Sequence, residues 1–369
     1  MHREKQLHYP ALDGVRGLAV LAVLVWHYAG VDYYNSGIAT TSDLALTISL
    51  LWGGVTFFFV LSGFLVGGIL LDHASSSNLL STFYLRRGFR IVPLYAVTLA
   101  TLFIAGSKWL GLRAVVPHLF EPELPWWSFV VFMQNIAMVL QRTMGGEWIS
   151  VTWSLAVEEH FYAILPIMVL LLRGRPRLFV AASLALMATA LALRAGMSGG
   201  YPLMPWHSDA LFGGVLVAMA KRNHLLWLRI KSLDPRFVLS AFLLICAVGF
   251  SLAKHGCHMG HWALQGLMAL AGMTLICGLL AHRETWWAKL FENRALRYAG
   301  TISYGVYLFH QSVAGLVFGF TLGTKMQCRD VSSFFACLGA ASLTLVLSHF
   351  AYRIIENPCI RFARRWGYA

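Results

Sequence analysis

Two ionisable residues on the first apolar segment have a spacing that could support acid–base chemistry. Arg16 and His27 lie within the run DGVRGLAVLAVLVWHY, residues 13–28. About three helical turns separate them, so both side chains share one helix face. At about 1.5 Å per residue, His27 lies about 16 Å beyond Arg16, deep in a bilayer. A histidine at that depth is a candidate general base. Arg16 also fits a helix anchor, and His27 a neutral imidazole bonded to a neighbouring helix.

Three closely spaced arginines form a second candidate site. Arg86, Arg87 and Arg90 are expected at the inner mouth of the third apolar segment, ahead of Pro93 and Tyr95. Guanidinium groups bind phosphate through paired, charge-assisted hydrogen bonds, which favours a polyphosphate ligand. The alternative is a topology anchor at the membrane surface. Pro93 is expected to start the third span, because the first helical turn tolerates a missing amide.

Two adjacent carboxylates lie in the fourth apolar segment. Glu158 and Glu159 follow Trp153 by one to two turns and are expected inside the outer end of this span. Two neighbouring carboxylates in an apolar setting would not both stay ionised without a partner. His27 is expected at a similar depth, so Glu158 is a candidate for orienting its ring. The alternative is a carboxylate that caps the helix or faces water.

A polar stripe marks the ninth apolar segment. Ser303, Tyr307 and His310 are spaced i, i+4 and i+7, so they share one helix face. Such a stripe lines a cavity or bonds to neighbouring helices. Asp209, near the start of the sixth segment, is another intramembrane acid that requires a partner.

The composition excludes a water-soluble domain. Of 369 residues, 58% are hydrophobic and only 12% are charged, and the mean hydropathy is +0.65. Average charged content is about twice as high. A net charge of +13 would suggest nucleic acid in a soluble protein, but here the basic residues separate apolar runs. The sequence therefore predicts an all-α polytopic membrane protein that contacts anionic lipid headgroups and no nucleic acid.

Ten apolar segments approach the length of about 20 residues that a bilayer requires, although the sixth is short. With the N-terminus inside, about 22 of the 29 lysines and arginines lie on the inner side, so both termini are predicted to be cytoplasmic. We expect a re-entrant or interfacial helix at 126–140 and an amphipathic loop at 282–299 on the inner membrane surface. The predicted spans are 14–33, 48–71, 91–111, 152–172, 177–195, 206–220, 237–254, 262–281, 300–322 and 332–353.

Six motifs in this order resemble the acyltransferase-3 family of integral membrane O-acyltransferases. The resemblance runs from about residue 8 to 362, so the chain is expected to be one transmembrane domain, 1–369, without a separate soluble domain. The motifs are LDGVRG at 12–17 with His27 after it, FFVLSGF at 58–64, RxxRIxPxY at 87–95, WSLxxEExFY at 153–162, SYxxYLxH at 303–310 and IENP at 355–358.

The resemblance implies transfer of an acyl group, usually acetyl, from cytoplasmic acyl-CoA to a hydroxyl of a carbohydrate or cell-surface glycan. Acetyl-CoA would be a co-substrate, with no permanently bound cofactor or metal, and the protein would lie in the bacterial plasma membrane. Whether the histidine acts as a base or carries the acyl group is left open, as is homo-oligomerisation. We predict His27, Glu158 and Glu159 as catalytic, Arg16, Arg86, Arg87, Arg90 and Tyr95 as donor-binding, and Trp153, Asp209, Tyr307 and His310 as acceptor-binding.

Two departures from the family pattern affect these predictions. His207 stands where many relatives carry an arginine two residues before the acid at Asp209, so any contact of that arginine is in doubt. Some relatives also end in an extra-membrane hydrolase-like domain. Ending at Ala369, this chain is expected to finish the transfer itself or to hand over to another protein.

Other interpretations remain at this point. An acyl-group or small-molecule transporter would use His27, Glu158 and Asp209 as a proton relay. An enzyme with a small diffusible acceptor such as a macrolide is a further alternative. The histidine-rich outer loop 255–261 matches no standard zinc spacing, so no metal site is predicted. A disulfide between Cys257 and Cys328 is a hypothesis that rests only on their expected outer location.

Overall fold

The computed structural model describes residues 9–38, 42–107, 109–197, 199–256 and 262–369, and the regular structure of these residues is helical throughout. Within this part of the chain, nine helical segments are long and apolar enough to cross a membrane, which confirms the expected all-α membrane class. They are Pro10–Asn35, Asp43–Asp72, Leu79–Ala105, Ser150–Leu171, Pro176–Gly196, Pro235–Lys254, Ala263–Ala281, Ser303–Leu322 and Val331–Ala363.

The expected sixth span is shorter than a membrane crossing. It forms α11, Ser208–Arg222, after a 3-10 turn at Met204–His207. Its 15 residues rise about 22 Å, whereas the hydrocarbon core is about 30 Å thick. Most of α11 is buried because it packs along α4, Gly54–Asp72. In the described part of the chain, the ten expected spans therefore correspond to nine long helices and this one short internal helix, at the segment that was expected to be short.

The first helix changes its winding at the predicted catalytic histidine. α1, Pro10–Val25, continues into a wide π-turn at Trp26–Gly30 and then into α2, Val31–Asn35. The Val31 N–H bonds to the carbonyl of Trp26, five residues back. Such single wide turns are frequent at functional sites. His27 is the second residue of this turn, so the helix is widened at the position that carries the His27 side chain.

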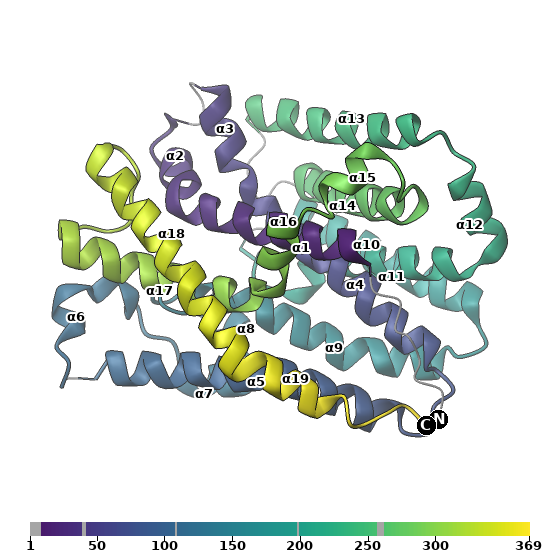
Figure 1. Cartoon of the computed structure of the whole chain (residues 1–369), viewed down its shortest axis with the longest axis horizontal. Helices are drawn as coiled ribbons and strands as arrows, with labels where there is room; N and C mark the ends of the chain where they lie inside the picture. The colour runs from purple at the N-terminus through teal and green to yellow at the C-terminus, as the bar shows by residue number, and fades with distance from the viewer. Residues whose placement is uncertain (1–8, 39–41, 108, 198, 257–261) are drawn as a thin grey trace.

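The loop at 282–299, which was expected on a membrane surface, packs against α1. It contains α15, Trp286–Leu290, and α16, Arg294–Thr301. A Cβ on Gly17 would overlap the carbonyl of Leu296, and a Cβ on Gly300 would overlap that of Asp13. The two backbones can approach this closely only because both contact positions are glycines. In Figure 1, α1 lies at the centre with α16 and α4 beside it.

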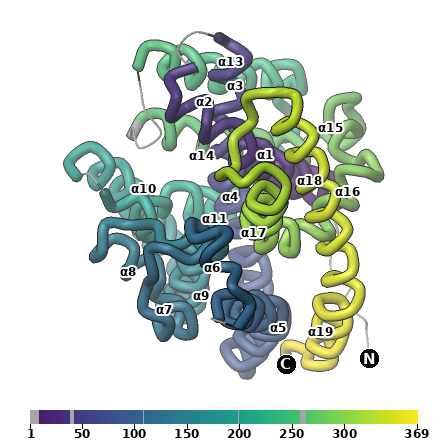
Figure 2. Tube along the Cα trace, turned by 90° about the vertical axis from the view of Figure 1, so that its left-hand side faces the viewer, coloured from purple at the N-terminus to yellow at the C-terminus, as the bar shows by residue number. Residues whose placement is uncertain are grey.

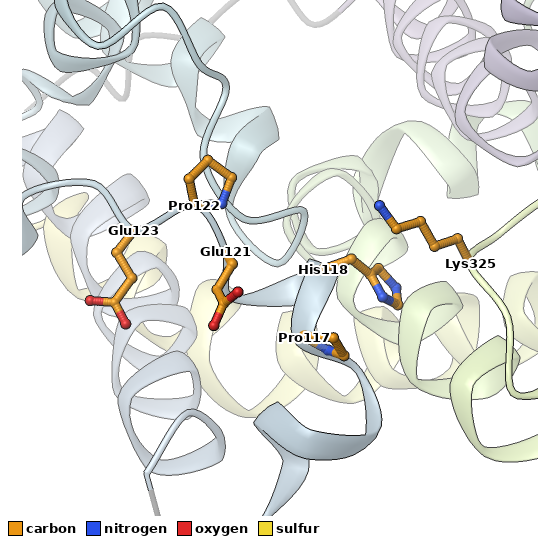
Figure 3. A pocket seen from close by; sticks show the side chains of 6 residues that line it. All are labelled: Pro117, His118, Glu121, Pro122, Glu123 and Lys325. Carbon is orange, nitrogen blue, oxygen red and sulfur yellow. The ribbon is translucent and has the colours of Figure 1, made fainter.

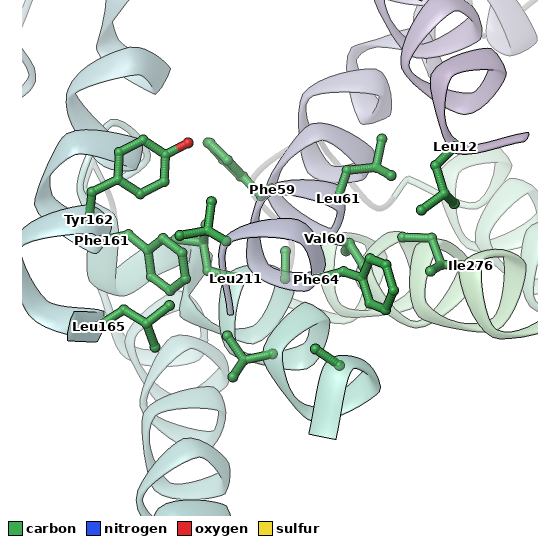
Figure 4. Packing of buried hydrophobic residues seen from close by; sticks show 14 of the residues in the cluster. Leu12, Phe59, Val60, Leu61, Phe64, Phe161, Tyr162, Leu165, Leu211 and Ile276 are labelled. Atoms are coloured by element: carbon green, nitrogen blue, oxygen red, sulfur yellow. The ribbon is translucent and has the colours of Figure 1, made fainter. Parts of the chain in front are cut away.

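The main core lies around α4. Phe59, Val60 and Leu61 of this helix are almost fully buried. Figure 4 shows them between Leu12 of α1 and Ile276 of α14, Trp262–Ala281, on one side and Phe161 of α9 on the other. α9 covers Trp153–Leu171. By contrast, α13, Pro235–Lys254, buries only Val238 and Gly249, as expected for a helix that faces lipid.

The third span begins about one dozen residues before the predicted start at residue 91. α5 covers Leu79–Ala105 and includes all three arginines of the second candidate site. Pro93 therefore lies inside the helix, and the prediction that it starts the span is wrong. Arg86 donates to the carbonyl of Trp366 and Arg87 lies over the ring of Tyr162, so the helix continues through the arginines with their side chains in contact with the protein.

The segment between α5 and α9 contains two short helices at the expected 126–140 stretch. α7, Trp126–Val130, and α8, Gln134–Leu140, are separated at Phe132, which adopts a left-handed φ of 56°. Gln134 and Asn135 are fully buried. Figure 2 places both helices at one edge of the bundle.

The remaining α-helices of the described residues are α3 Asp43–Ser49, α6 Leu112–Val115, α10 Pro176–Gly196, α12 His224–Lys231, α17 Ser303–Leu322, α18 Val331–Ala351 and α19 Asn357–Ala363.

Candidate active site

The predicted catalytic histidine has a second histidine as its partner. His310 of α17 places Nε2 at 3.1 Å from Nδ1 of His27, and the ring centroids are 4.7 Å apart. Nδ1 of His27 also lies 2.9 Å from the carbonyl oxygen of Val23. His310 is buried, whereas His27 is half-buried and remains accessible. The stripe on the ninth span therefore supplies a partner for the histidine of the first.

These contacts determine which ring nitrogens carry protons. A carbonyl oxygen can only accept, so Nδ1 of His27 carries a hydrogen toward Val23. Nδ1 of His310 likewise donates to the carbonyls of Tyr307, at 2.8 Å, and Val306, at 3.1 Å. In the neutral pair, the single Nδ1–H of His27 is therefore shared between the carbonyl oxygen of Val23 and Nε2 of His310. This assignment leaves Nε2 of His27 with a free lone pair that can accept a proton.

The backbone around His310 is held from both sides. The hydroxyl of Tyr28, the neighbour of His27, donates to the carbonyl of His310 at 3.0 Å and also contacts Thr344 of α18. Further along α17, the hydroxyl of Tyr307 lies 2.9 Å from that of Ser154 and bonds to the carbonyl of Val151. The two histidines thus sit in a fixed frame made by α1, α17, α18 and α9.

A cluster of arginines and carboxylates lies near Arg16 of α1. Arg16, Arg87 and Arg90 all lie within electrostatic range of Glu158. Arg16 also pairs with Asp13 at 3.1 Å. All three arginines are at least partly accessible. The structure therefore brings together three of the four predicted donor-site arginines, which come from two different spans.

Glu158 does not contact His27, so the expected pairing of these residues is wrong. Its carboxylate accepts a hydrogen bond from Tyr162 at 3.0 Å, and Tyr162 in turn bonds to Ser62 of α4 at 2.8 Å. Similar depth in the membrane did not bring the carboxylate to the histidine, because the arginines on α1 and α5 require a counter-charge in their apolar surroundings. The carboxylate pair belongs to the arginine cluster, and Oε1 of Glu159 is buried without a hydrogen-bonding partner among the described residues.

Arg86 and Tyr95 form their hydrogen bonds outside this cluster, although Tyr95 lies within electrostatic range of Glu159. Arg86 donates to the carbonyl of Trp366 at 2.8 Å and lies over the ring of Tyr368, so it holds the segment after α19. Tyr95 donates to the carbonyl of Phe129 at 3.0 Å and stacks on Phe132. Tyr95 thereby fixes the break between α7 and α8. Among the described residues, neither Arg86 nor Tyr95 forms a hydrogen bond with Arg16.

Asp209 has a protein partner that the sequence did not reveal. Arg194 of α10 binds both carboxylate oxygens of Asp209, the carbonyl of Trp206 at 2.7 Å and the side chain of Gln265 at 3.2 Å. The guanidinium is fully buried. A charged residue inside the fifth apolar segment was the available signal for this partner. Arg194 thus supplies the counter-charge of Asp209 from another helix.

The predicted acceptor residue Trp153 is also packed inside the protein. It contacts the rings of His207, at 5.3 Å, Tyr201, at 4.8 Å, and Phe59, at 6.2 Å. His207 lies 2.7 Å from the carbonyl oxygen of Tyr201. This aromatic cluster fixes the end of α9 next to α11, and it leaves little of Trp153 available to a ligand.

Removing one partner of the Arg194–Asp209 pair is expected to destabilise the fold strongly. Asp209→Asn leaves the guanidinium buried without its counter-charge, which costs about 3–5 kcal/mol of unfolding free energy. Thermal unfolding in detergent would measure this loss. Arg194→Met combined with Asp209→Leu should recover much of the stability, because no charge then remains buried. An Asp209→Asn protein as stable as the wild type would contradict a structural role for the pair.

Two surface hollows lie apart from these residues. The larger, of 690 Å³, is lined by Pro117, His118, Glu121, Pro122, Glu123 and Lys325. Figure 3 shows that it is formed by the segment before α7 and the segment after α17. A neighbouring hollow of 510 Å³ shares Pro122 and Glu123 with it. Neither hollow includes His27 or the arginine cluster.

The remaining candidate ligands give little further information. Cys257 and most of the loop 255–261 lie outside the described residues, so the Cys257–Cys328 disulfide and the histidine-rich loop are not tested. Among the described residues Cys328 forms no disulfide, and it packs against the cluster that contains Cys337.

The comparisons with known proteins agree with the motifs. A family model described as an acyltransferase domain, that of the acyltransferase-3 family, matches residues 9–353. A putative O-acetyltransferase of Staphylococcus aureus is 26% identical over 96% of this chain. The peptidoglycan O-acetyltransferase OatA of Listeria monocytogenes is 24% identical over 96%, and the putative peptidoglycan O-acetyltransferase YrhL of Bacillus subtilis is 26% identical over 97%.

The chain covers 58%, 56% and 56% of the lengths of these three relatives. No solved structure matches the chain. Because the family model matches most of its length, the chain belongs to the acyltransferase-3 family of membrane proteins.

Proposed function

We propose that this protein is a membrane O-acetyltransferase that moves an acetyl group from acetyl-CoA to a hydroxyl of a cell-wall or cell-surface glycan. The observation that carries the proposal is the His27–His310 pair, which leaves a free lone pair on Nε2 of an accessible histidine. The names of the relatives, which include peptidoglycan O-acetyltransferases, support a glycan acceptor. The accessible arginines Arg16, Arg87 and Arg90 support a donor that carries phosphates.

In this proposal His27 is the general base. Its Nε2 takes the proton from the acceptor hydroxyl as the oxygen attacks the thioester carbonyl carbon. The carbon–sulfur bond then breaks, and the proton on Nε2 passes to the leaving sulfur. The products are the O-acetylated glycan and free CoA, and His27 returns to its starting state. His310 touches neither reactant, so it is a positioning residue that stabilises the Nδ1–H form of His27 and the charge that develops on it.

Replacing His310 by alanine is expected to lower kcat by about 10–100-fold and to leave the KM for acetyl-CoA nearly unchanged. The reason is that His27 remains but loses the acceptor that fixes its tautomer and ring orientation. Release of the CoA thiol with a glycan fragment as acceptor would measure both constants. Replacing Tyr307 by phenylalanine, which keeps the ring beside His310, should have a smaller effect. An equal rise in KM with kcat unchanged would instead place His310 in substrate binding.

The proposed reaction is tested by following label from acetyl-labelled acetyl-CoA into peptidoglycan fragments. The purified protein in nanodiscs should release one CoA thiol for each ester formed. Mild base should remove the label from the glycan, since O-acetyl esters are base-labile and amides are not. Label that remains after mild base treatment would contradict an O-acetyltransferase.

A further inference from the structure

Two cations converge on one aromatic ring at the beginning of α1. Tyr9 precedes the helix, and Nζ of Lys221 lies 4.4 Å from the centroid of its ring and contacts its hydroxyl. Cζ of Arg283 lies 4.9 Å from the same centroid. Lys221 comes from the end of α11 and Arg283 from the segment after α14. Residues from three chain segments far apart in sequence therefore place two positive charges beside one aromatic ring.

These two cations lack the carboxylate partners that neighbouring cations have. Arg222, the next residue after Lys221, pairs with Asp72 at 2.7 Å, and Lys289 pairs with Glu284 at 3.3 Å. Among the described residues, neither Lys221 nor Arg283 forms an ion pair with an acid. Attraction to an aromatic face contributes only about 0.5–1 kcal/mol at exposed sites. Two like charges beside the same ring favour an anion next to them.

The position of this pair relates it to the donor site. Tyr9 lies seven residues before Arg16, which is about two helical turns, or about 10 Å along α1. Arg16 belongs to the cluster with Arg87 and Arg90. In CoA, a single ribose joins the pyrophosphate to the 3′-phosphate, so the two anionic groups are separated by a short, semi-rigid unit. A pyrophosphate near Arg16 would place the 3′-phosphate within reach of a second cationic site nearby.

We propose that Lys221 and Arg283, held over Tyr9, bind the phosphate monoester at the ribose 3′-position of acyl-CoA. The proposal rests on the proposed function, because it assigns one group of the same donor. It predicts that the protein selects CoA thioesters over their 3′-dephospho forms. Arg16, Arg87 and Arg90 cannot provide this selection through the pyrophosphate, which both donors share.

The same chemistry could bind the phosphate of an anionic lipid headgroup at the inner membrane surface. A lipid headgroup and the 3′-phosphate of CoA can be distinguished by what the site responds to. A headgroup site responds to lipid composition and ignores the 3′-phosphate of the donor. A donor site distinguishes CoA from dephospho-CoA in a bilayer that contains only zwitterionic lipid.

The test compares acetyl-CoA with 3′-dephospho-acetyl-CoA, using the full chain in phosphatidylcholine nanodiscs. The wild type should show a KM at least about tenfold lower for acetyl-CoA, as expected for charge-assisted hydrogen bonds. The double variant Lys221→Gln/Arg283→Gln should lose this preference, with its KM for the dephospho donor nearly unchanged. Arg229→Gln/Lys231→Gln is the matched control, because it removes two exposed cations from α12 and should keep the preference.

Direct binding of CoA and dephospho-CoA separates this site from the reaction. Preferential binding of CoA that the double variant loses supports the site even if no acetyl transfer is detected, in which case only the proposed function fails. Equal binding of the two ligands by the wild type overturns the site. It is also overturned if the double variant weakens both donors equally, or if its effect appears only when phosphatidylglycerol is added to the nanodiscs.

Discussion

Replacing His27 by alanine is expected to lower kcat for acetyl transfer by about 10²–10⁴-fold, the usual contribution of a positioned general base. Binding of acetyl-CoA should change little, because the arginine cluster that is proposed to hold the donor lies toward the other end of α1. Thiol release measures the rate, and equilibrium binding of labelled acetyl-CoA measures the affinity. The two measurements together separate loss of chemistry from loss of the donor site.

A matched control is available for this substitution. His224, the first residue of α12, is exposed and makes no side-chain contact with the histidine pair, so His224→Ala should retain full activity. His27→Ala should still fold with only a modestly lower Tm, because it removes the bonds of one side chain to Val23 and His310, at about 0.5–1.5 kcal/mol each. Full activity of His27→Ala would remove His27 from the catalytic machinery.

Replacing Gly63 by alanine is expected to be among the most destabilising single changes in the core. A Cβ at this position would overlap the carbonyl of Leu211 on α11, and Gly214 faces the carbonyl of Val60 in the same way. Backbone on both sides cannot move aside as a flexible side chain does. We expect a loss of about 3 kcal/mol or more of unfolding free energy, at or above the upper end of the usual range for overpacking. Thermal unfolding of the purified protein in detergent would show it as a lower Tm.

Gly339→Ala on α18 provides the comparison. Nothing lies within 4 Å of a Cβ built at Gly339, and alanine is favoured over glycine inside a helix by roughly 0.5–1 kcal/mol. Its Tm should therefore equal or exceed that of the wild type. If Gly63→Ala and Gly339→Ala gave the same Tm, the close contact of α4 with α11 would not be a feature of the folded protein.

The membrane class and the main helices could be predicted because a membrane-spanning helix is recognised from the hydropathy and length of one continuous segment, without knowledge of its neighbours. Lysines and arginines between apolar segments were less reliable as markers of where each helix begins and ends. The arginines of α5 lie inside the helix, and the carbonyl of Trp366 gives Arg86 a partner that the sequence did not reveal. The short helix α11 shows the opposite case. Its sequence is apolar enough to suggest a span, but its neighbours rather than lipid cover it.

Residue chemistry singles out the candidate site residues in the sequence, whereas the contacts between them could not be predicted. His27 and His310 are 283 positions apart, and their contact depends on how α1 and α17 pack. The same limit explains the wrong pairing of Glu158 with His27 and the unexpected role of Arg194. A buried charge signals that a partner exists, but the sequence does not say which helix provides it. The role of Arg86 in holding the segment after α19 was hidden for the same reason.

The central claim is that this protein cleaves acetyl-CoA and transfers the acetyl group to a glycan hydroxyl through His27. The most direct measurement uses purified protein in nanodiscs with acetyl-labelled acetyl-CoA and peptidoglycan fragments, and it counts thiol release and label on the glycan in the same sample. We predict a one-to-one ratio for the wild type, with both signals lost in His27→Ala. Absence of CoA binding and of thiol release in the wild type, combined with movement of intact small molecules across proteoliposomes, would contradict the account and favour a transporter.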